Sequence, residues 1–247
     1  MGNVLRKMVL GSRFRVQGSG CGSGFVVLGS STREPRTTEP RTTEPRTEPS
    51  TLNPEPRTNT FVSIQAKASK VRLLLFDVDG VLTDGKILLH GDGTEGKQFD
   101  IKDGIAMVWA QRAGLTVGFL SARTSASTAQ RAAQLGITLV HQGVASKLET
   151  YEQIIGELAV DDEEVAYMGD DIVDLGVLER VGLSAAPADA VQDVRTRVHW
   201  VSGAPGGRGA VRELIEVVLR AQGHWETLVA SYMGDRPRVA GTHPNKP

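Results

Sequence analysis

Acidic residues gather at two places in the sequence where they could do chemistry together. Asp77 and Asp79 follow the apolar run VRLLLF, and Asp170 and Asp171 follow a second apolar run, VAYM, and one glycine. Carboxylates held close together cannot all ionise without a counter-charge, which a hard divalent cation such as Mg²⁺ supplies. With that charge present, an aspartate can attack a phosphoryl group, because its repulsion from the phosphate is neutralised.

Two more polar side chains follow the same pattern. Ser121 ends a third apolar run, and Lys147 begins the stretch after a fourth. Taken alone, Ser121 is typical of a helix N-cap, Lys147 of a surface lysine and Asp170 of a loop. Together they predict a cluster of carboxylates, one hydroxyl and one ammonium at one edge of a sheet.

The elements that must position these residues alternate along the chain. Short apolar runs predict strands, and helical stretches lie between them, which indicates an α/β fold: a Rossmann-like, open parallel sheet with helices on both faces. Ligands in that architecture bind beyond the carboxyl ends of the strands. The predicted strands are Val71–Asp77, Thr116–Leu120, Thr138–Val140, Val165–Met168 and Leu183–Ala185, and the predicted helices are Gly104–Ala113, Ser125–Leu135, Lys147–Leu158 and Ile172–Val181.

One element interrupts the alternation. Lys86–His90 and Lys97–Ile101 flank the segment GDGTEG, whose Asp-Gly pair is typical of a hairpin turn. A small β-hairpin should therefore protrude just after the first strand. An edge strand at Val198–Ser202 and a closing helix at Ala210–Gln222 complete the predicted domain.

Composition excludes several functional classes. The 247 residues carry 28 basic and 29 acidic side chains, so a global basic field for nucleic-acid binding is not expected. No apolar run approaches the ~20 residues that a membrane-spanning helix needs, so no membrane partner is expected either. Cys21 is the single cysteine, which excludes an internal disulfide and any cysteine-rich metal site.

The charge is unevenly distributed along the chain. Residues 1–69 are basic and contain a repeat of the type T-E-P-R-T, which has no apolar face and should be disordered. This segment is open to several interpretations: a misassigned start, a dispensable tail, a partner-binding arm or a targeting peptide. Residues 70–223 are expected to form the folded domain, and residues 224–247 a flexible tail.

In its polar motifs the chain resembles the haloacid dehalogenase superfamily. That superfamily has an aspartate pair DxD after the first strand, then a Ser or Thr, then a Lys, then an acidic GDxxxD or GDDxxD. All four occur here in order. They are Asp77-Val78-Asp79, Ser121, Lys147 and Gly169–Asp174.

The resemblance implies a role for each residue. Asp77 would be the nucleophile and a magnesium ligand, and Asp79 the general acid and then the general base, with its backbone carbonyl on the metal. Ser121 and Lys147 would hold the phosphoryl oxygens. Asp170 would complete the metal site, with Asp171 and Asp174 nearby.

Spacing indicates a member without a cap domain. Larger relatives insert such a domain between the first three motifs, but Asp77 lies only 44 residues before Ser121, and Ser121 only 26 before Lys147. The hairpin would then be the only lid, so a neighbouring subunit should close the site. We therefore expect a homo-oligomer.

Within the superfamily, the chain is most similar to the 3-deoxy-D-manno-octulosonate 8-phosphate phosphatase family. This resemblance implies a cytoplasmic, magnesium-dependent, tetrameric phosphatase of lipopolysaccharide precursor synthesis. It also implies that Asp79, Lys147 and a further set of residues contact the substrate: Asp100, Ile101, Lys102, Asp103, Gly104, Arg123 and Arg131. The segments that carry the resemblance are FDVDGVLTDG (76–85), FDIKDG (99–104), SARTS (121–125), KLETY (147–151), YMGDDIVDLGVLERVGLS (167–184) and GGRGAVRELIE (206–216).

Several alternatives stay open. Arg123 and Arg131 could be solvated helix residues, and GGRGAVRE could be an ordinary loop or a segment that reaches an adjacent active site. The chain also departs from the family at Ala122, usually glycine, and at Ile105–Val108, which lacks the usual basic residue. Rival functions are a phosphatase of a nine-carbon sialic-type acid 9-phosphate, a module associated with a sugar-acid cytidylyltransferase, and a two-component receiver domain.

Overall fold

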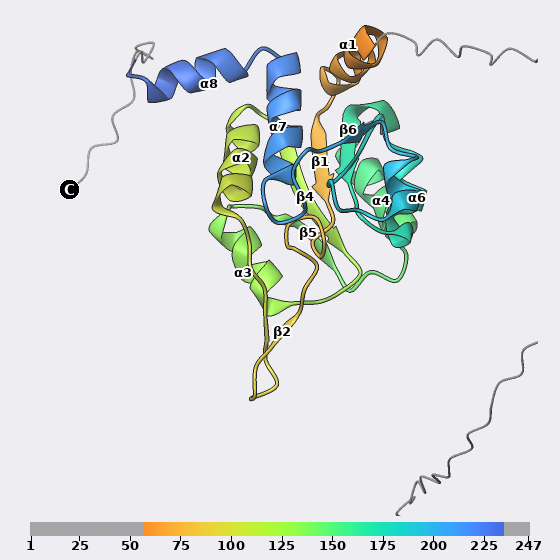
Figure 1. The fold of residues 1–247 in the computed structure, drawn as a ribbon, viewed down its shortest axis with the longest axis vertical. Coiled ribbons are helices and arrows are strands. Elements are labelled where there is room, and N and C mark those ends of the chain that lie inside the picture. Colours follow the sequence, from red (N-terminus) through yellow and green to blue (C-terminus); the bar gives the residue numbers. More distant parts are fainter. Residues whose placement is uncertain (1–56, 235–247) are drawn as a thin grey trace, which may run out of the picture. The chain divides into compact units, whose positions relative to one another are not determined.

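A six-stranded parallel sheet forms the centre of the protein (Figure 1). The computed structural model describes residues 57–234. The strand order is β5-β4-β1-β6-β7-β8, and every neighbouring pair is parallel, which confirms the predicted fold class. The strands are β1 (Leu73–Phe76), β4 (Thr116–Ser121), β5 (Leu139–Gln142), β6 (Val165–Met168), β7 (Leu183–Ala186) and β8 (Trp200–Val201).

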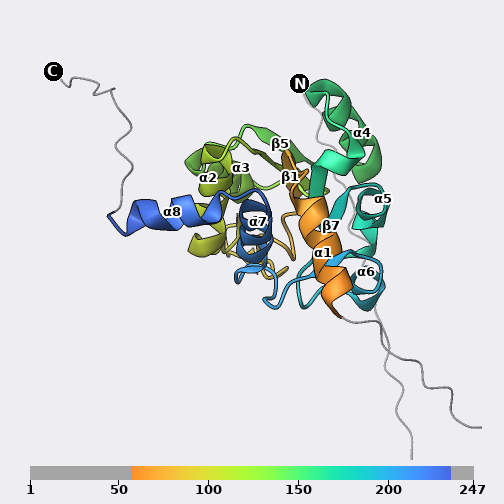
Figure 2. The same cartoon turned by 90° about the horizontal axis from the view of Figure 1, so that it is seen from above.

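Helices cover both faces of this sheet, and alternate residues of the strands point to opposite faces (Figure 2). In β1, Leu74 and Phe76 pack with one set of helices, whereas Leu73 and Leu75 pack with the other. The first set is α1 (Arg57–Ala68), α2 (Ile101–Arg112), α3 (Ala126–Gln134) and α7 (Ala210–Ala221). The second set is α4 (Lys147–Leu158), α5 (Leu175–Leu178) and α6 (Gln192–Arg195). Two 3₁₀ turns, η1 (Asp162–Glu164) and η2 (Ile172–Asp174), complete the chain path.

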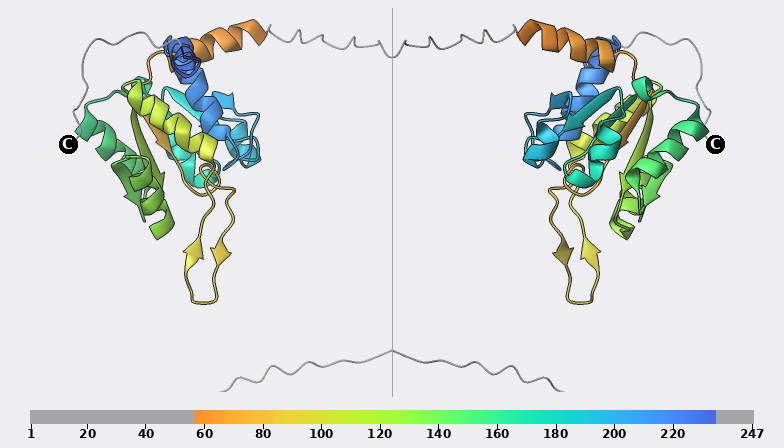
Figure 3. Two further views of the ribbon diagram at one scale, coloured as in Figure 1. Left: turned by 90° about the vertical axis from the view of Figure 1, so that its left-hand side faces the viewer. Right: turned by 90° about the vertical axis from the view of Figure 1, so that its right-hand side faces the viewer.

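The predicted hairpin protrudes from the sheet edge, but its strands are shorter than expected (Figure 3). They are β2 (Leu88–Leu89) and β3 (Glu95–Gly96), so the second strand lies within the segment predicted as the turn. Asp92 explains the shift, because its Oδ1 accepts hydrogen bonds from the backbone and hydroxyl of Thr94 and tightens the turn. The predicted second arm, Lys97–Ile101, is not a strand in the structure and leads directly into α2.

The N-terminal boundary predicted at residue 70 is too late, because residues 57–68 form helix α1. Ile64 and Ala68 are buried in the core, and Lys67 Nζ donates a hydrogen bond to the carbonyl of Gly182 at 3.0 Å. Gln222, the C-cap of α7, donates to the carbonyls of Ala68 and Val71. Helix α1 is thus part of the folded domain, whereas the T-E-P-R-T repeat lies outside the described residues.

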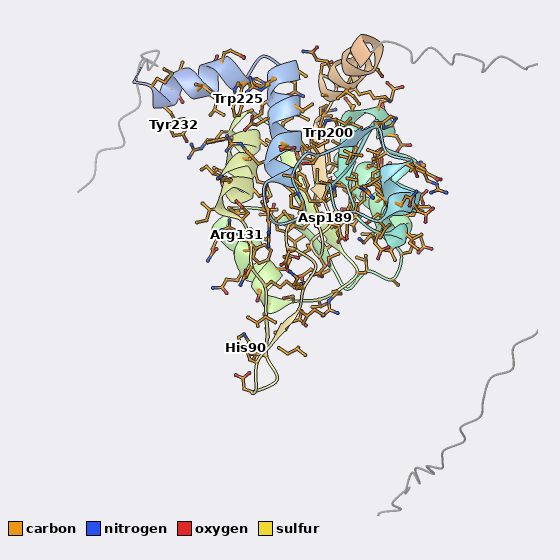
Figure 4. All side chains as sticks on the ribbon, viewed as in Figure 1. His90, Arg131, Asp189, Trp200, Trp225 and Tyr232 are labelled. Atoms are coloured by element: carbon orange, nitrogen blue, oxygen red, sulfur yellow. The ribbon has the colours of Figure 1, made fainter. Side chains whose placement is uncertain are left out.

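The chain after His224 also contains a helix that the sequence did not predict, α8 (Trp225–Tyr232). Its Trp225 ring packs edge-on against Trp109 of α2, and Trp109 Nε1 donates to the Tyr232 hydroxyl at 3.0 Å. Figure 4 labels Trp225 and Tyr232 on this helix. The Arg212 guanidinium lies 4.2 Å from the centre of the Trp109 ring. These contacts come from distant parts of the sequence, which is why local periodicity did not reveal the helix. Across residues 57–234, no helix has the length and apolar character needed to cross a membrane.

Candidate active site

Three strand ends bring the predicted polar residues together. Asp77 directly follows β1, Ser121 is the last residue of β4, and Asp170 lies two residues after β6. Strand β1 lies between β4 and β6, and Phe76 pairs with residues of both neighbours. The carboxyl ends of the three strands therefore meet where the chain connections diverge to opposite sides of the sheet, the usual ligand position in this architecture.

A pocket of about 280 Å³ opens at this edge. It includes every residue that the sequence predicts as catalytic or metal-binding. The lining residues are Asp77, Asp79, Gly85, Ser121, Ala122, Arg123, Lys147, Asp170, Asp171 and Val173. The expected clustering of carboxylates, hydroxyl and ammonium is present in the structure.

Lys147 links two buried carboxylates. It is the first residue of α4, whose N-cap Ser146 accepts a hydrogen bond from the backbone of Glu149. Its Nζ lies 3.0 Å from Asp77 Oδ2 and 2.6 Å from Asp174 Oδ1, and all three side chains are almost fully buried. A buried ammonium requires such partners, so Lys147 is held beside Asp77 by the fold itself.

Asp174 is fully engaged by protein donors. Its Oδ1 accepts from Lys147 and from the Tyr167 hydroxyl, and its Oδ2 accepts from the backbone N–H groups of Asp170 and Asp171. These bonds bend the chain after β6, which explains why the helix predicted over residues 172–181 is a 3₁₀ turn followed by one α-helical turn. Asp174 therefore acts as the anchor of Lys147.

The site carries more negative charge than its lysine can offset. Burial raises the pKa of Asp77 to about 7, with repulsion from Asp174 adding to the effect and Lys147 opposing it. Burial, Asp77 and Asp174 together raise the pKa of Asp170 to about 8. Burial opposes the charge on Lys147, but the two carboxylates outweigh it and raise the lysine pKa. The cluster is one that a cation would stabilise.

The carboxylates fit a divalent metal ion. One oxygen each from Asp77, Asp170 and Asp174 lies within 4.8 Å of the others. Each Asp174 oxygen already accepts two hydrogen bonds, whereas each Asp77 oxygen has a single donor, the Val78 N–H on Oδ1 and Lys147 on Oδ2. Asp77 and Asp170 are therefore the better ligands, and all-oxygen donors suit Mg²⁺. Gly80 allows the Asp170 carboxylate to lie close to the loop that follows β1. Its φ is +89°, and a Cβ there would lie 2.0 Å from Asp170 Oδ2. The role of the Asp79 backbone carbonyl as a metal ligand stays a prediction.

The side chain of Asp79 contacts two basic residues. Lys97, which follows β3, forms an ion pair with Oδ1, and Arg123 Nε lies 3.6 Å from Oδ2. Arg123 in turn pairs with Glu95 at 2.7 Å. Oδ2 of Asp79 is buried and has no hydrogen-bond partner among the described residues. Sequence reasoning missed Lys97 and Glu95, since a lysine and a glutamate in a hairpin give no sign of pointing inward.

The stretch predicted to contact a sugar acid is not among the residues that line this pocket. Asp100 is the N-cap of α2, Ile101 is 81% exposed and Lys102 is exposed. The carboxylate of Asp103 is buried and accepts from the backbone N–H groups of Gly209 and Arg212, at the start of α7.

Arg131 packs against the same stretch. Its Nη2 donates to the carbonyl of Asp100 at 3.2 Å and lies against Gly104, where a Cβ would be 2.1 Å from that atom. Burial raises the pKa of Asp103 to about 6, although the hydrogen bonds from the N–H groups of Gly209 and Arg212 act to lower it. The part that residues 100–104 and Arg131 play in binding stays a prediction.

The glycine-rich segment before α7 packs against the loop that follows β1. The N–H of Gly207 donates to the carbonyl of Val81 at 2.9 Å, and that of Gly206 donates to Asp189 Oδ1 at 2.9 Å. A Cβ at Gly206 would lie 1.8 Å from the carbonyl oxygen of Gly80. Within its own chain, the segment supports the loop that carries Asp79 and Gly80.

Comparison with known proteins agrees with this geometry. A family profile described as haloacid dehalogenase-like hydrolase matches residues 120–214. The 3-deoxy-D-manno-octulosonate 8-phosphate phosphatase KdsC of Escherichia coli K12 is 43% identical over 158 residues, covering 64% of this chain and 84% of KdsC. The chain belongs to the 3-deoxy-D-manno-octulosonate 8-phosphate phosphatase family of haloacid dehalogenase-like hydrolases.

Solved structures of this family include metal-bound members. The Moraxella catarrhalis phosphatase, in complex with magnesium, phosphate and KDO, is 32% identical, with a TM-score of 0.67 over 68% of this chain and 97% of that one. The cobalt-bound Haemophilus influenzae phosphatase is 35% identical, with a TM-score of 0.65 over 68% and 98%. Bound metals in these relatives agree with the oxygen cluster seen here.

Proposed function

We propose that this chain hydrolyses 3-deoxy-D-manno-octulosonate 8-phosphate to 3-deoxy-D-manno-octulosonate and phosphate. The observation that carries the proposal is the buried pair of Asp77 and Lys147 beside Asp170 at the sheet edge, in a chain that covers 84% of an E. coli enzyme of that name. The reaction would contribute to lipopolysaccharide precursor synthesis. The family resemblance alone supports its location in the cytoplasm.

In the proposed reaction, an oxygen of Asp77 attacks phosphorus and the bond to the sugar oxygen breaks. Asp79 gives a proton to the departing oxygen. Asp79 then takes a proton from a water molecule, which attacks the aspartyl-phosphate, releases phosphate and restores Asp77. Lys147 and the Ser121 hydroxyl stabilise the phosphoryl oxygens. The buried, fixed position of Lys147 supports its share of this task.

Asp77 and Asp170 would hold the magnesium ion, with the carbonyl of Asp79. When bound, the ion offsets the charge of the carboxylates and of the phosphoryl oxygens. The raised pKa values of Asp77 and Asp170 show that protein groups alone do not offset the charge of the two carboxylates. Both groups must be ionised to act as ligands, so a bound cation would supply the missing positive charge.

Recognition of the sugar acid would fall to the basic side chains of Arg123 and Arg131. Arg123 lines the pocket, and Arg131 lies beside the start of α2, so both can face a substrate that carries a phosphate and a carboxylate. We assign the stretch from Asp100 to Gly104 to the same task, with its exposed members Ile101 and Lys102 facing the sugar.

The proposed enzyme is a homo-oligomer, and the family resemblance implies a tetramer. The hairpin supports assembly, because Ile87, Leu88 and Leu89 expose 48%, 52% and 73% of their surface on a protruding arm. Apolar side chains so exposed mark a contact surface. A neighbouring copy would bury them and exclude water from the pocket.

Phosphate release from a panel of phosphosugars tests the substrate assignment. With magnesium present, the purified full chain should hydrolyse 3-deoxy-D-manno-octulosonate 8-phosphate with the highest kcat/KM of the panel, at least about tenfold above a nine-carbon sialic-type acid 9-phosphate. Glucose 6-phosphate, which lacks the carboxylate, serves as the matched control. A preference for the nine-carbon acid, or equal slow rates on every ester, would contradict the assignment.

A further inference from the structure

We infer that Lys97 is a positioning residue that orients Asp79 for proton transfer to the leaving oxygen. The inference rests on the proposed phosphatase function, because it concerns the acid of that reaction. Lys97 belongs to the hairpin and none of the four sequence motifs includes it.

Burial sets Lys97 apart from the other hairpin lysine. Only 2% of its side chain is exposed, whereas 78% of the Lys86 side chain is exposed. Among the described residues, the single hydrogen-bond acceptor of the Lys97 ammonium is Asp79 Oδ1. Removing an ammonium from water is costly without a partner. The ion pair therefore fixes both side chains: Asp79 holds Lys97, and Lys97 holds Asp79.

The contact distinguishes the two oxygens of Asp79. Lys97 occupies Oδ1, while Oδ2 is buried and has no hydrogen-bond partner among residues 57–234. Arg123 approaches Oδ2 only to 3.6 Å, beyond hydrogen-bond distance. Because Asp79 lines the pocket, Oδ2 is the oxygen left to exchange a proton with the substrate.

The same arm also contacts Arg123, which lines the pocket. Glu95 of β3 pairs with Arg123 at 2.7 Å, and the Ser127 hydroxyl donates to the Glu95 carbonyl at 3.4 Å. The arm from β3 to α2 is thus tied to the pocket at two places. Lys97 can therefore hold Asp79 in one orientation, which efficient proton transfer requires.

Leaving-group dependence separates positioning of the acid from a general structural role. A sugar alkoxide needs a proton as it leaves, whereas 4-nitrophenolate leaves without one. In Lys97→Met, kcat/KM for a primary alkyl phosphate should fall about 10- to 100-fold, while kcat/KM for 4-nitrophenyl phosphate changes less than about threefold. The ratio kcat/KM is compared because it covers only the steps through departure of the leaving group, before Asp79 acts as base on the aspartyl-phosphate formed from either ester. Lys97→Arg should recover part of the loss, and Lys86→Met should leave both rates unchanged.

The alkyl ester used is any primary sugar phosphate that the wild-type chain hydrolyses, so this test stands even if the eight-carbon substrate proves wrong. In an Asp79→Asn background, adding Lys97→Met should cause no further loss with the alkyl ester. Equal losses on both esters, unchanged turnover of the alkyl ester, or an undiminished effect in the Asp79→Asn background would each overturn the inference. Circular dichroism of each variant checks that the fold is retained.

Discussion

At the scale of single residues, Asp174 links the candidate nucleophile to the interior of the protein. Its Oδ1 binds both Lys147 and the fully buried Tyr167, and Lys147 reaches Asp77. The motif sequence indicated that Asp77, Lys147 and Asp174 lie near one another. It did not indicate that Asp174 faces the lysine or that Tyr167 supports it, because side-chain direction depends on packing against β6 and η2.

Tyr167→Phe should weaken this link. Removing a buried hydrogen bond to a charged group should lower the free energy of unfolding by about 1–3 kcal/mol. The value of kcat should also fall, because Asp174, which holds Lys147, loses one of its donors. Urea unfolding and phosphate release measure the two effects.

Tyr151→Phe is the matched control for that substitution. The Tyr151 hydroxyl donates to Asp162 at 2.6 Å, away from the pocket residues, so its loss should affect stability alone. If both variants changed kcat equally, or neither changed it, Tyr167 would not act through Lys147.

At the scale of elements, the strand ends were the predictable part. Strand β6 and helix α4 have the bounds that the sequence predicts, because a continuous apolar run and a helix that starts just after the N-cap Ser146 are local signals. The hairpin register depended on the side chain of Asp92, and helices α1 and α8 depend on contacts with α7 and with Trp109. Such contacts between distant segments leave no periodic trace in the sequence.

Asp103 of α2 holds the start of α7, and its raised pKa makes that link dependent on pH. With a pKa of about 6 against an ordinary 3.8, the folded protein binds the proton more tightly than the unfolded chain. As pH rises from 4 to 6, the unfolded chain ionises first, so the contribution of Asp103 to stability falls by up to about 3 kcal/mol.

Asp103→Asn removes this titration. The difference in free energy of unfolding between variant and wild type should shift in favour of the variant as pH rises through that range, as followed by urea unfolding at several pH values. A difference that stays constant, or that shifts toward the wild type, would contradict the role of burial at Asp103.

At the scale of the whole molecule, the single chain has an open pocket and exposes apolar side chains on its hairpin. The sequence predicted one capless domain, and the structure extends that domain to include α1 and α8. How copies associate cannot be predicted from one chain, because the partner surface is not encoded in local patterns.

Charged residues on the hairpin should disrupt assembly. The double substitution Leu88→Asp and Leu89→Asp places two buried charges in the proposed contact, so the particle mass measured by light scattering should fall toward that of a monomer. Leu158→Asp, at a leucine 38% exposed on α4, is the matched control and should leave the mass unchanged. An unchanged mass for the hairpin variant would exclude the hairpin from assembly.

The most direct test of the whole assignment is the rate of phosphate release from 3-deoxy-D-manno-octulosonate 8-phosphate, measured with magnesium for the wild-type chain and for Asp77→Asn. The wild type should turn over, and the variant, which keeps its shape but lacks the nucleophilic carboxylate, should be slower by roughly a thousandfold or more. Retention of more than about a tenth of the wild-type rate by a folded Asp77→Asn would contradict catalysis through Asp77.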